Sequence, residues 1–331
     1  MYSLAFLLIV GWFSSSQSAQ QTNCPPVDLL VEYESSPLGI DKLSPRFSWA
    51  LCADPSARGI LQYGYSIEVN NTDMNTVVWS SGLVVSNSTT NIPYQGTLKA
   101  DSGFSWRVQW WQDATTSSPW SESMPFTSGL TNEGVWRNAS WITLPNASNP
   151  TTSPTHVLLR SKTFTLPADK VIARAALYIV GLGYYQVYLD SRQVSTHYLG
   201  AFTTFETRVL YDTWDVTALL TENPLSDHVL AVELGPGFYN QHTVNADRFK
   251  LARVLLSVKF TDGSDFFVTS SPDSWTGAVG HVTSVDIYDG EHVDMRDGMY
   301  IYIYLYIYIR CVLDVLSRVI DKCVLYILSR G

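Results

Sequence analysis

Four carboxylates near the C-terminal end of the sequence have the residue type that hydrolysis needs: Asp286, Asp289, Glu291 and Asp294. A glycosidase uses an acid and a carboxylate base, about 6.5–9.5 Å apart for inversion or about 5–5.5 Å for retention. Nothing in the spacing of this cluster makes two of its members face each other. We therefore interpret them as solvated turn and linker residues that contact another domain, and we assign no catalytic residue.

Sugar binding is the second chemistry that the residue types allow. Aromatic rings pack on the CH-rich faces of sugars, and carboxylates or amides hydrogen-bond to the hydroxyls. Asp212 has the right group for a hydroxyl, although a turn role suits it as well, and Arg208 could pair with such an acid. The aromatic candidates near predicted loop ends are Tyr184, Phe202, Trp214, Phe238 and Tyr239. Each would equally suit a core or a sheet face.

Other catalytic motifs are missing from the sequence. The six histidines accompany no Gly-x-Ser-x-Gly elbow and no papain-like cysteine context. Gly181-Leu-Gly183 follows a predicted strand but lacks the third glycine and the helix of a phosphate loop. There is no Cys-x-x-Cys or His-x-x-His spacing, so we expect no metal centre and no cofactor. The net charge of −9 argues against nucleic acid or an anionic membrane as a partner.

The N-terminus has the features of an export signal. Residues 4–13 are apolar but too few to span a bilayer, and small and polar residues follow from Ser14 to Ala19. We expect residues 1–19 to be a signal peptide and the protein to be secreted; a structural helix is the alternative. In an oxidising compartment Cys24 and Cys52 can pair. N-glycosylation sequons begin at Asn70, Asn87, Asn138 and Asn146.

The elements that must position these residues are predicted to be short strands. In residues 24–130 apolar residues alternate with polar ones, as in Tyr63 to Val69 and in Phe104 to Trp110, and turn-rich stretches separate the runs. This pattern predicts a β-sandwich resembling fibronectin type III. Residues 131–155 are interpreted as a linker rich in Pro, Asn, Ser and Thr, fixed to a domain surface by Trp136 and Trp141.

Residues 156–297 predict a second sandwich. Asp262-Gly263 separates two apolar runs and indicates a hairpin. One short helix is expected over Asp215–Leu220, with Asp215 as its N-cap. The tail, residues 298–331, begins with alternating Tyr and Ile, which leaves both faces apolar and is atypical of a half-exposed strand. A repeated TATA tract read in frame encodes Tyr-Ile-Tyr-Ile, so we interpret this tail as foreign to the fold.

Many segments, in order, resemble the start of bacterial-type α-L-rhamnosidases. Ser36-Pro-Leu-Gly-Ile-Asp41 and Ser44-Pro-Arg-Phe-Ser-Trp49 are similar to the opening of their first module. The most specific segments of the second module are Arg208-Val-Leu-Tyr-Asp212, Trp214-Asp-Val-Thr217 and Leu234-Gly-Pro-Gly-Phe-Tyr239. The resemblance spans about residues 28–297 and implies an all-β fold, a fibronectin III-like sandwich followed by a galactose-binding or jelly-roll-like one.

The family's activity is the hydrolysis of terminal α-L-rhamnose from glycosides, and an (α/α)6 barrel carries its catalytic acids. The resemblance stops before that barrel, so we expect this chain to be an inactive N-terminal fragment whose partners are a rhamnose-containing glycoside and the catalytic domain of a full-length parent. Some relatives bind rhamnose through calcium in the second sandwich, but Gly181-Leu-Gly183 offers no side-chain oxygen here. Asp190-Ser191, Phe202 and Phe205 also depart from the family pattern.

Two alternatives remain from the sequence. A free-standing secreted carbohydrate-binding protein would bind rhamnosides saturably through its second sandwich. A cell-surface adhesion or receptor fragment would carry a transmembrane helix, and the sequence has no apolar stretch of that length.

Overall fold

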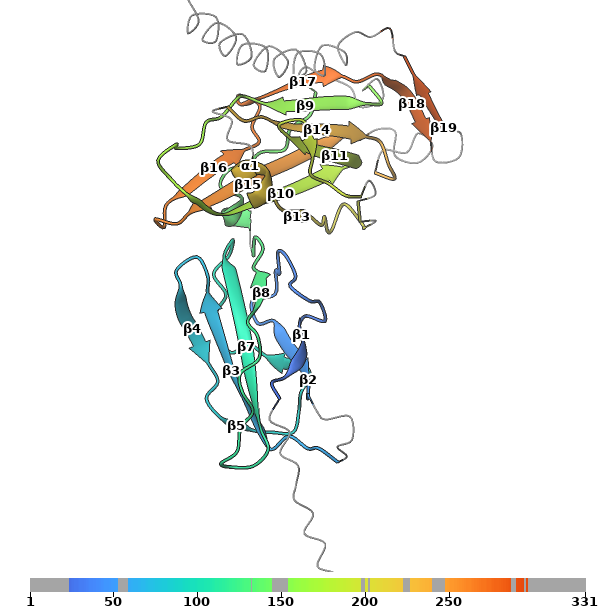
Figure 1. Cartoon of the computed structure of the whole chain (residues 1–331). Coiled ribbons are helices and arrows are strands. Elements are labelled where there is room, and N and C mark those ends of the chain that lie inside the picture. Colours follow the sequence, from blue (N-terminus) through green and yellow to red (C-terminus); the bar gives the residue numbers. More distant parts are fainter. Residues whose placement is uncertain are drawn as a thin grey trace, which may run out of the picture.

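The computed structural model describes residues 24–52, 59–131, 133–144, 154–197, 200–201, 203–222, 227–239, 248–286, 290–294 and 296. The expected signal peptide and the atypical tail lie outside these residues. Figure 1 shows two β-sandwiches joined end to end, the first with its strands upright and the second with its strands lying across. The predicted all-β class with two consecutive sandwiches is therefore confirmed.

The first sandwich packs two antiparallel sheets face to face. One sheet has the order β1-β2-β6, with bounds Val27–Val31, Arg46–Ala50 and Ile92–Pro93. The other has the order β4-β3-β7-β8, with bounds Thr76–Ser80, Gly64–Asn71, Gly103–Trp111 and Met124–Thr127. A short strand, β5 (Val84–Val85), also pairs with β3.

Alternation along β3 and β7 builds the core of this sandwich. Ile67, Val69, Trp106 and Val108 are buried, as the period-two pattern predicts. Phe47 of the opposite sheet stacks on Trp106 with ring centroids 4.5 Å apart. Tyr63, which the same pattern placed with the apolar set, precedes β3 and is partly exposed.

The second sandwich is also built from two sheets. The four-stranded sheet has the order β13-β10-β15-β16, with bounds Asp212–Asp215, Ile172–Leu182, Leu251–Phe260 and Asp265–Thr269. The five-stranded sheet has the order β12-β11-β14-β9-β17, with bounds Arg192–Gln193, Tyr184–Leu189, Leu230–Gly235, Val157–Ser161 and Trp275–Val279. A separate hairpin of β18 (Val282–Asp286) and β19 (Gly290–Val293) follows.

Two local signals in this sandwich can be compared with the structure. β15 and β16 form the expected hairpin, and Gly263 takes the positive φ of 82° that the turn needs. The helix α1 spans Thr217–Glu222, two residues later than expected, because Asp212–Asp215 is drawn into strand β13. The Asp215 carboxylate still accepts a hydrogen bond from the Thr217 N–H at 2.9 Å. Within the described part of the chain, no helix has the length and hydropathy to cross a bilayer.

The connection between the sandwiches packs against the second one. A 3-10 helix, η1 (Glu133–Trp136), places the Trp136 ring among buried residues of β10 and β15, and the Arg253 guanidinium lies 4.6 Å from its centroid. Ile142 then pairs with Ala252 of β15. Trp141, by contrast, is partly exposed. The Trp136 part of the expected linker therefore packs against the outer face of the four-stranded sheet.

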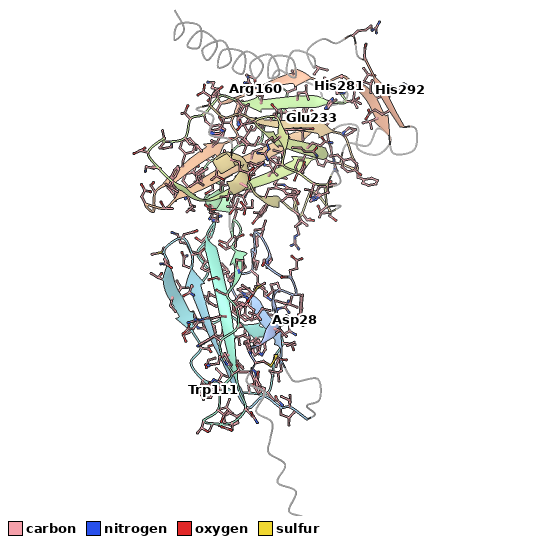
Figure 2. All side chains as sticks on the ribbon, viewed as in Figure 1. Asp28, Trp111, Arg160, Glu233, His281 and His292 are labelled. Atoms are coloured by element: carbon pink, nitrogen blue, oxygen red, sulfur yellow. A yellow bond between two sulfur atoms is a disulfide. The ribbon has the colours of Figure 1, made fainter. Side chains whose placement is uncertain are left out.

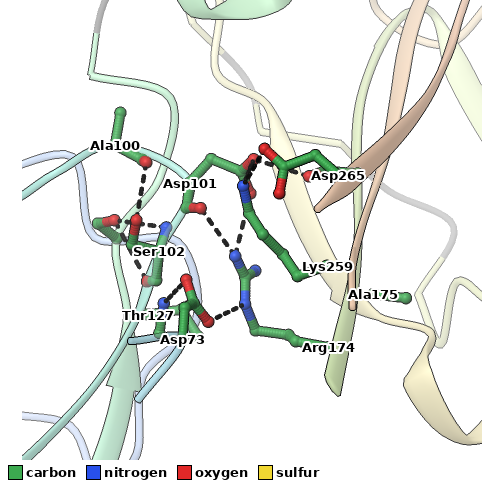
Figure 3. Close-up of polar contacts among 12 residues, drawn as sticks. Asp73, Ala100, Asp101, Ser102, Thr127, Arg174, Ala175, Lys259 and Asp265 are labelled. Carbon is green, nitrogen blue, oxygen red and sulfur yellow. Dashed lines mark hydrogen bonds and ion pairs between the residues drawn. The ribbon is translucent and has the colours of Figure 1, made fainter. Parts of the chain in front are cut away.

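A buried polar group joins the two sandwiches, and we call its members the Asp101 cluster: Asp73, Asp101, Arg174, Tyr178, Ser257 and Lys259. Asp101 lies just before β7 in the first sandwich, and its side chain is 3% exposed. Its carboxylate accepts hydrogen bonds from the Tyr178 hydroxyl at 2.9 Å and the Ser257 hydroxyl at 2.7 Å. Arg174 and Lys259 approach the same carboxylate at 3.3 and 3.4 Å (Figure 3). All four donors come from β10 and β15 of the second sandwich.

Tyr211 makes a second connection between the sandwiches. Its hydroxyl donates to the Asp41 carboxylate and accepts the Leu130 N–H at 2.7 Å. A Cβ on Gly129 would lie 2.1 Å from that hydroxyl oxygen, so a side chain at this position would displace the contact. The second sandwich is thus held against the first at the face formed by β10, β15 and the segment before β13.

Candidate functional site

A hollow at one end of the second sandwich collects several of the aromatic candidates. It forms where β10 turns into β11 and where the chain leaves β14. The residues that line it are Gly181, Gly183, Tyr184, Tyr185, Gly200, Ala201, Thr203, Phe205, Val209, Leu210, Asp212, Phe238 and Tyr239. We refer to it below as the hollow.

Glycines allow the two chain segments of the hollow to approach closely. Gly183 has a φ of 120°, and a Cβ there would lie 2.2 Å from the Gly235 carbonyl oxygen. Gly237 has a φ of 50°, and a Cβ there would lie 2.6 Å from the Tyr184 ring. Because both positions exclude a side chain, they bring Tyr184 and Phe238 side by side.

Three of the five aromatic candidates meet in the hollow. The rings of Tyr184 and Phe238 are perpendicular, with centroids 6.1 Å apart. Tyr239 packs edge-on against Phe205 at 5.0 Å. Trp214 is not part of the lining and packs beside the core and against His197, at 4.9 Å. Phe202 lies outside the described residues.

The polar groups of the hollow centre on Asp212. Its carboxylate accepts a hydrogen bond from the Tyr185 hydroxyl, and the His197 Nε2 lies 3.9 Å from Oδ2. Burial raises the pKa of Tyr185 above its ordinary value, and the neighbouring Asp212 carboxylate raises it further. Tyr185 therefore stays protonated and donates, which leaves Asp212 as an acceptor.

Sequence reasoning weighed Asp212 but missed Tyr185 and His197. The alternation along β11 assigns Tyr185 to the core side, and its burial agrees with that pattern. Its hydroxyl group is what reaches the hollow, and the position of a hydroxyl at the end of a core residue has no periodic signal. His197 lies beyond β12, on a segment for which no regular element was expected.

The acidic cluster predicted near the C-terminus does not form a catalytic pair among its described members. Asp289 and the side chain of Asp286 lie outside the description, and Glu291 is exposed on β19. Asp294 pairs with Arg296 at 2.8 Å, and the hydrogen bonds from Arg296 lower the pKa of Asp294 to about 2. A carboxyl group with that pKa is ionised at neutral pH and cannot serve as a general acid.

Histidines gather where the β18–β19 hairpin leaves the second sandwich. The rings of His156 and His281 are 5.2 Å apart, and the His156 Nε2 lies 3.9 Å from the Glu233 carboxylate. Figure 2 shows Glu233 and His281 at this end of the sandwich and His292 on the hairpin. Burial, and then the charge of His281, lower the pKa of His156 to about 4. Within the described residues, no group of three or more acidic, His or Cys side chains is arranged to hold a metal ion.

The structure also places the cysteine and sequon residues of the first sandwich. Cys24 and Cys52 form a disulfide whose Cα atoms are 5.6 Å apart. Asn70 lies on β3 and is half-buried, Asn87 is exposed after β5, and Asn138 is exposed in the turn after η1. Asn146 lies outside the described residues.

Both sandwiches match domains that are known from other proteins. Residues 26–132 match the family model of the Rha78A-like N-terminal immunoglobulin domain. Residues 170–302 match the family model of the alpha-L-rhamnosidase N-terminal domain. The first domain is thus described as immunoglobulin-like, the broader class to which the expected fibronectin-like sandwich belongs.

Similar full-length proteins are considerably longer. An alpha-L-rhamnosidase of Formosa agariphila is 29% identical over 333 residues, covering 89% of this chain and 34% of that protein. The structure of an alpha-L-rhamnosidase from Dictyoglumus thermophilum has a TM-score of 0.71 and 30% identity, over 84% of this chain and 32% of that one. An Aspergillus terreus rhamnosidase structure gives a TM-score of 0.69 at 25% identity, over 82% of this chain and 31% of that one. The chain spans about a third of the length of these relatives.

Proposed function

Because this chain corresponds to the N-terminal region of the α-L-rhamnosidases, we propose that it serves the hydrolysis of terminal α-L-rhamnose from glycosides, as the non-catalytic, substrate-binding part of such an enzyme. The single observation that supports this is the presence of both N-terminal domains of the family, in order, along most of the chain. The resemblance of motifs found in the sequence points to the same substrate class.

Within the chain, we assign rhamnoside binding to the hollow. Tyr184, Phe238 and Tyr239 supply aromatic edges and faces for the apolar side of a deoxysugar, and Asp212 supplies an acceptor for its hydroxyls. Asp212 is the carboxylate in the lining of the hollow, whereas glycoside hydrolysis uses a pair. The geometry therefore supports binding at this place and not bond cleavage.

Binding can be measured on the full chain by titration with methyl α-L-rhamnoside, with methyl α-D-glucoside as the control sugar. We expect saturable binding of the rhamnoside alone. Phe238→Ala should weaken it about five-fold, since a lost aromatic contact costs roughly 1 kcal/mol. Val171→Ala, at an exposed residue outside the hollow, is the matched control and should leave the affinity unchanged. A chain that binds neither sugar would refute the assignment.

An activity assay separates binding from catalysis. The chain alone should release no nitrophenol from nitrophenyl α-L-rhamnoside, because we place no acid and base pair in the hollow. Release above the uncatalysed rate, abolished by Asp212→Asn, would make the hollow a catalytic site and overturn the binding role.

A free-standing secreted carbohydrate-binding protein is the second candidate, and the same hollow favours it. Saturable binding agrees with both proposals. A messenger RNA whose reading frame continues past residue 297 into a catalytic domain would favour the enzyme, and a transcript that ends at residue 331 would favour the binding protein.

A further inference from the structure

The first sandwich exposes apolar side chains along one edge. β4 is the last strand of its sheet (Figure 1). Val77 and Val78 on this strand are 59% and 42% exposed. On the neighbouring β5, Val85 is 64% exposed. An edge strand with exposed apolar residues is a template for pairing with another chain, and soluble proteins usually cover or blunt it.

A sequon asparagine lies directly beside Val77. In the register of β3 and β4, Asn70 is opposite Val77, so both side chains project from the same face of the sheet. This is the outer face, because Glu68, two residues before Asn70, forms its ion pair with Arg107 there. Asn70 is half-buried, and the carbohydrate on it would extend over β4.

A second sequon asparagine lies beside Val85. Asn87 follows β5 and is exposed. The Gln62 amide donates to the carbonyl oxygens of Ser86 and Ser88, each at 2.9 Å, and so holds the residues on both sides of Asn87. The Ser86 N–H also bonds the carbonyl of Tyr63, whose ring is partly exposed. The Asn87 side chain therefore leaves a fixed loop next to exposed apolar residues.

We propose that Asn70 and Asn87 carry N-linked glycans that cover this apolar edge and keep the first sandwich from pairing with a second copy. Modification needs a lipid-diphosphate-linked oligosaccharide as donor. The Asn side-chain nitrogen forms a bond to C1 of the first sugar, the bond from C1 to the phosphate oxygen breaks, and the lipid diphosphate leaves as the amide loses one proton. The reaction takes place on the chain before it folds, so the strand position of Asn70 is no obstacle.

Asn138 provides an internal comparison. It carries an Asn-x-Ser sequon, whereas Asn70 and Asn87 carry Asn-x-Thr, and it is exposed, but it lies in the turn between the sandwiches and not on the surface of β4 and β5. A glycan at Asn138 would leave the apolar edge uncovered. The variants Asn70→Gln with Asn87→Gln therefore have Asn138→Gln as their matched control.

The test is to secrete the full chain from a eukaryotic host behind the host's own export signal. Peptide mass spectrometry then measures the fraction of each sequon that is glycosylated, and sedimentation measures self-association. We expect glycans at Asn70 and Asn87 and a monomer. The double variant should bind a hydrophobic dye roughly two-fold more strongly or better and should self-associate, whereas Asn138→Gln should do neither.

Enzymatic removal of the glycans from the folded wild-type chain gives the same readout without depending on the folding of a variant. In the deglycosylated chain, Val77→Gln with Val85→Thr should restore the monomer. An unmodified Asn70 or Asn87 would overturn the proposal. So would a deglycosylated chain that stays monomeric and binds no additional dye.

Discussion

Asp101 and Asp212 each accept a hydrogen bond from a tyrosine hydroxyl of the second sandwich, but their surroundings differ. The Asp101 side chain is 3% exposed and is contacted by two hydroxyls and two cations across the domain interface. The Asp212 side chain is 36% exposed, receives the Tyr185 hydroxyl and borders the hollow.

This difference separates a structural carboxylate from one that can bind a ligand. The oxygens of Asp101 are fully used by the protein, so its charge holds two domains together and has no capacity left for another partner. Asp212 is partly solvated and keeps lone pairs that face an open surface. Substitutions at the two positions should therefore affect different properties, stability in one case and sugar affinity in the other.

The largest effect is expected for Asp101→Asn. It leaves Arg174 and Lys259 buried with less negative charge beside them, and breaking a buried ion pair costs about 3–5 kcal/mol. Denaturant unfolding of the full chain measures the loss. Glu222→Gln removes an exposed partner of Arg192 and should cost less than about 0.5 kcal/mol. Equal effects of the two variants would contradict the structural role of Asp101.

The next-largest effect should be a pH dependence of stability caused by the buried His156. The His156 side chain is 9% exposed, and its Nδ1 has no hydrogen-bond partner among the described residues. The folded pKa of about 4 lies below the ordinary value of 6.5, so the folded state binds fewer protons than the unfolded state between these values. The contribution of neutral His156 to the free energy of unfolding is therefore fully present above pH 6.5. It is lost as the pH falls, by up to about 3 kcal/mol at pH 4.

The control for this pH dependence is His156→Gln, which cannot titrate. Carboxylates also contribute to acid unfolding, and His281 and Glu233 face His156, so the informative quantity is the difference between wild type and variant. We expect the wild type to lose more stability than the variant between neutral pH and about pH 4. Parallel pH curves would show that His156 is not the group responsible.

A smaller effect should follow from removing one donor of the Asp101 cluster. Tyr178→Phe deletes one hydroxyl but leaves Ser257, Arg174 and Lys259 in contact with Asp101. The expected loss is about 1 kcal/mol, the net value of a single hydrogen bond. A loss as large as that of Asp101→Asn would mean that the hydroxyl, and not the charge, holds the interface.

Local patterns in the sequence predicted much of the fold. The alternation of Ile67, Val69, Trp106 and Val108 and the turn at Asp262-Gly263 act over neighbouring residues, so period and turn chemistry suffice to find them. Three of the aromatic candidates, chosen because they lie near predicted loop ends, line the hollow. Trp214 does not line the hollow, since alternation along a strand tells which residues share a face but not which end of the sandwich they reach.

The Asp101 cluster had no such signal. Asp101 and Arg174 are 73 residues apart, and Asp101 and Ser257 are 156 apart, so their contact depends on how the two sandwiches pack against each other. From the sequence, a charged residue in a polar stretch is expected to be solvated. Only the contact with the second sandwich buries Asp101. The contact of Tyr211 with Asp41 also joins the two sandwiches, so the sequence gives no local signal for it.

Thermal unfolding of wild type, Asp101→Asn and Asp212→Asn, with and without methyl α-L-rhamnoside, tests the contrast between the two carboxylates most directly. A ligand that binds only the folded state raises the unfolding temperature, and at a fixed ligand concentration the rise grows with the logarithm of the affinity. Asp101→Asn should unfold at a lower temperature yet keep the rhamnoside-induced rise. Asp212→Asn should unfold near the wild-type temperature and lose the rise. An Asp212→Asn variant that keeps the full rise would contradict the account.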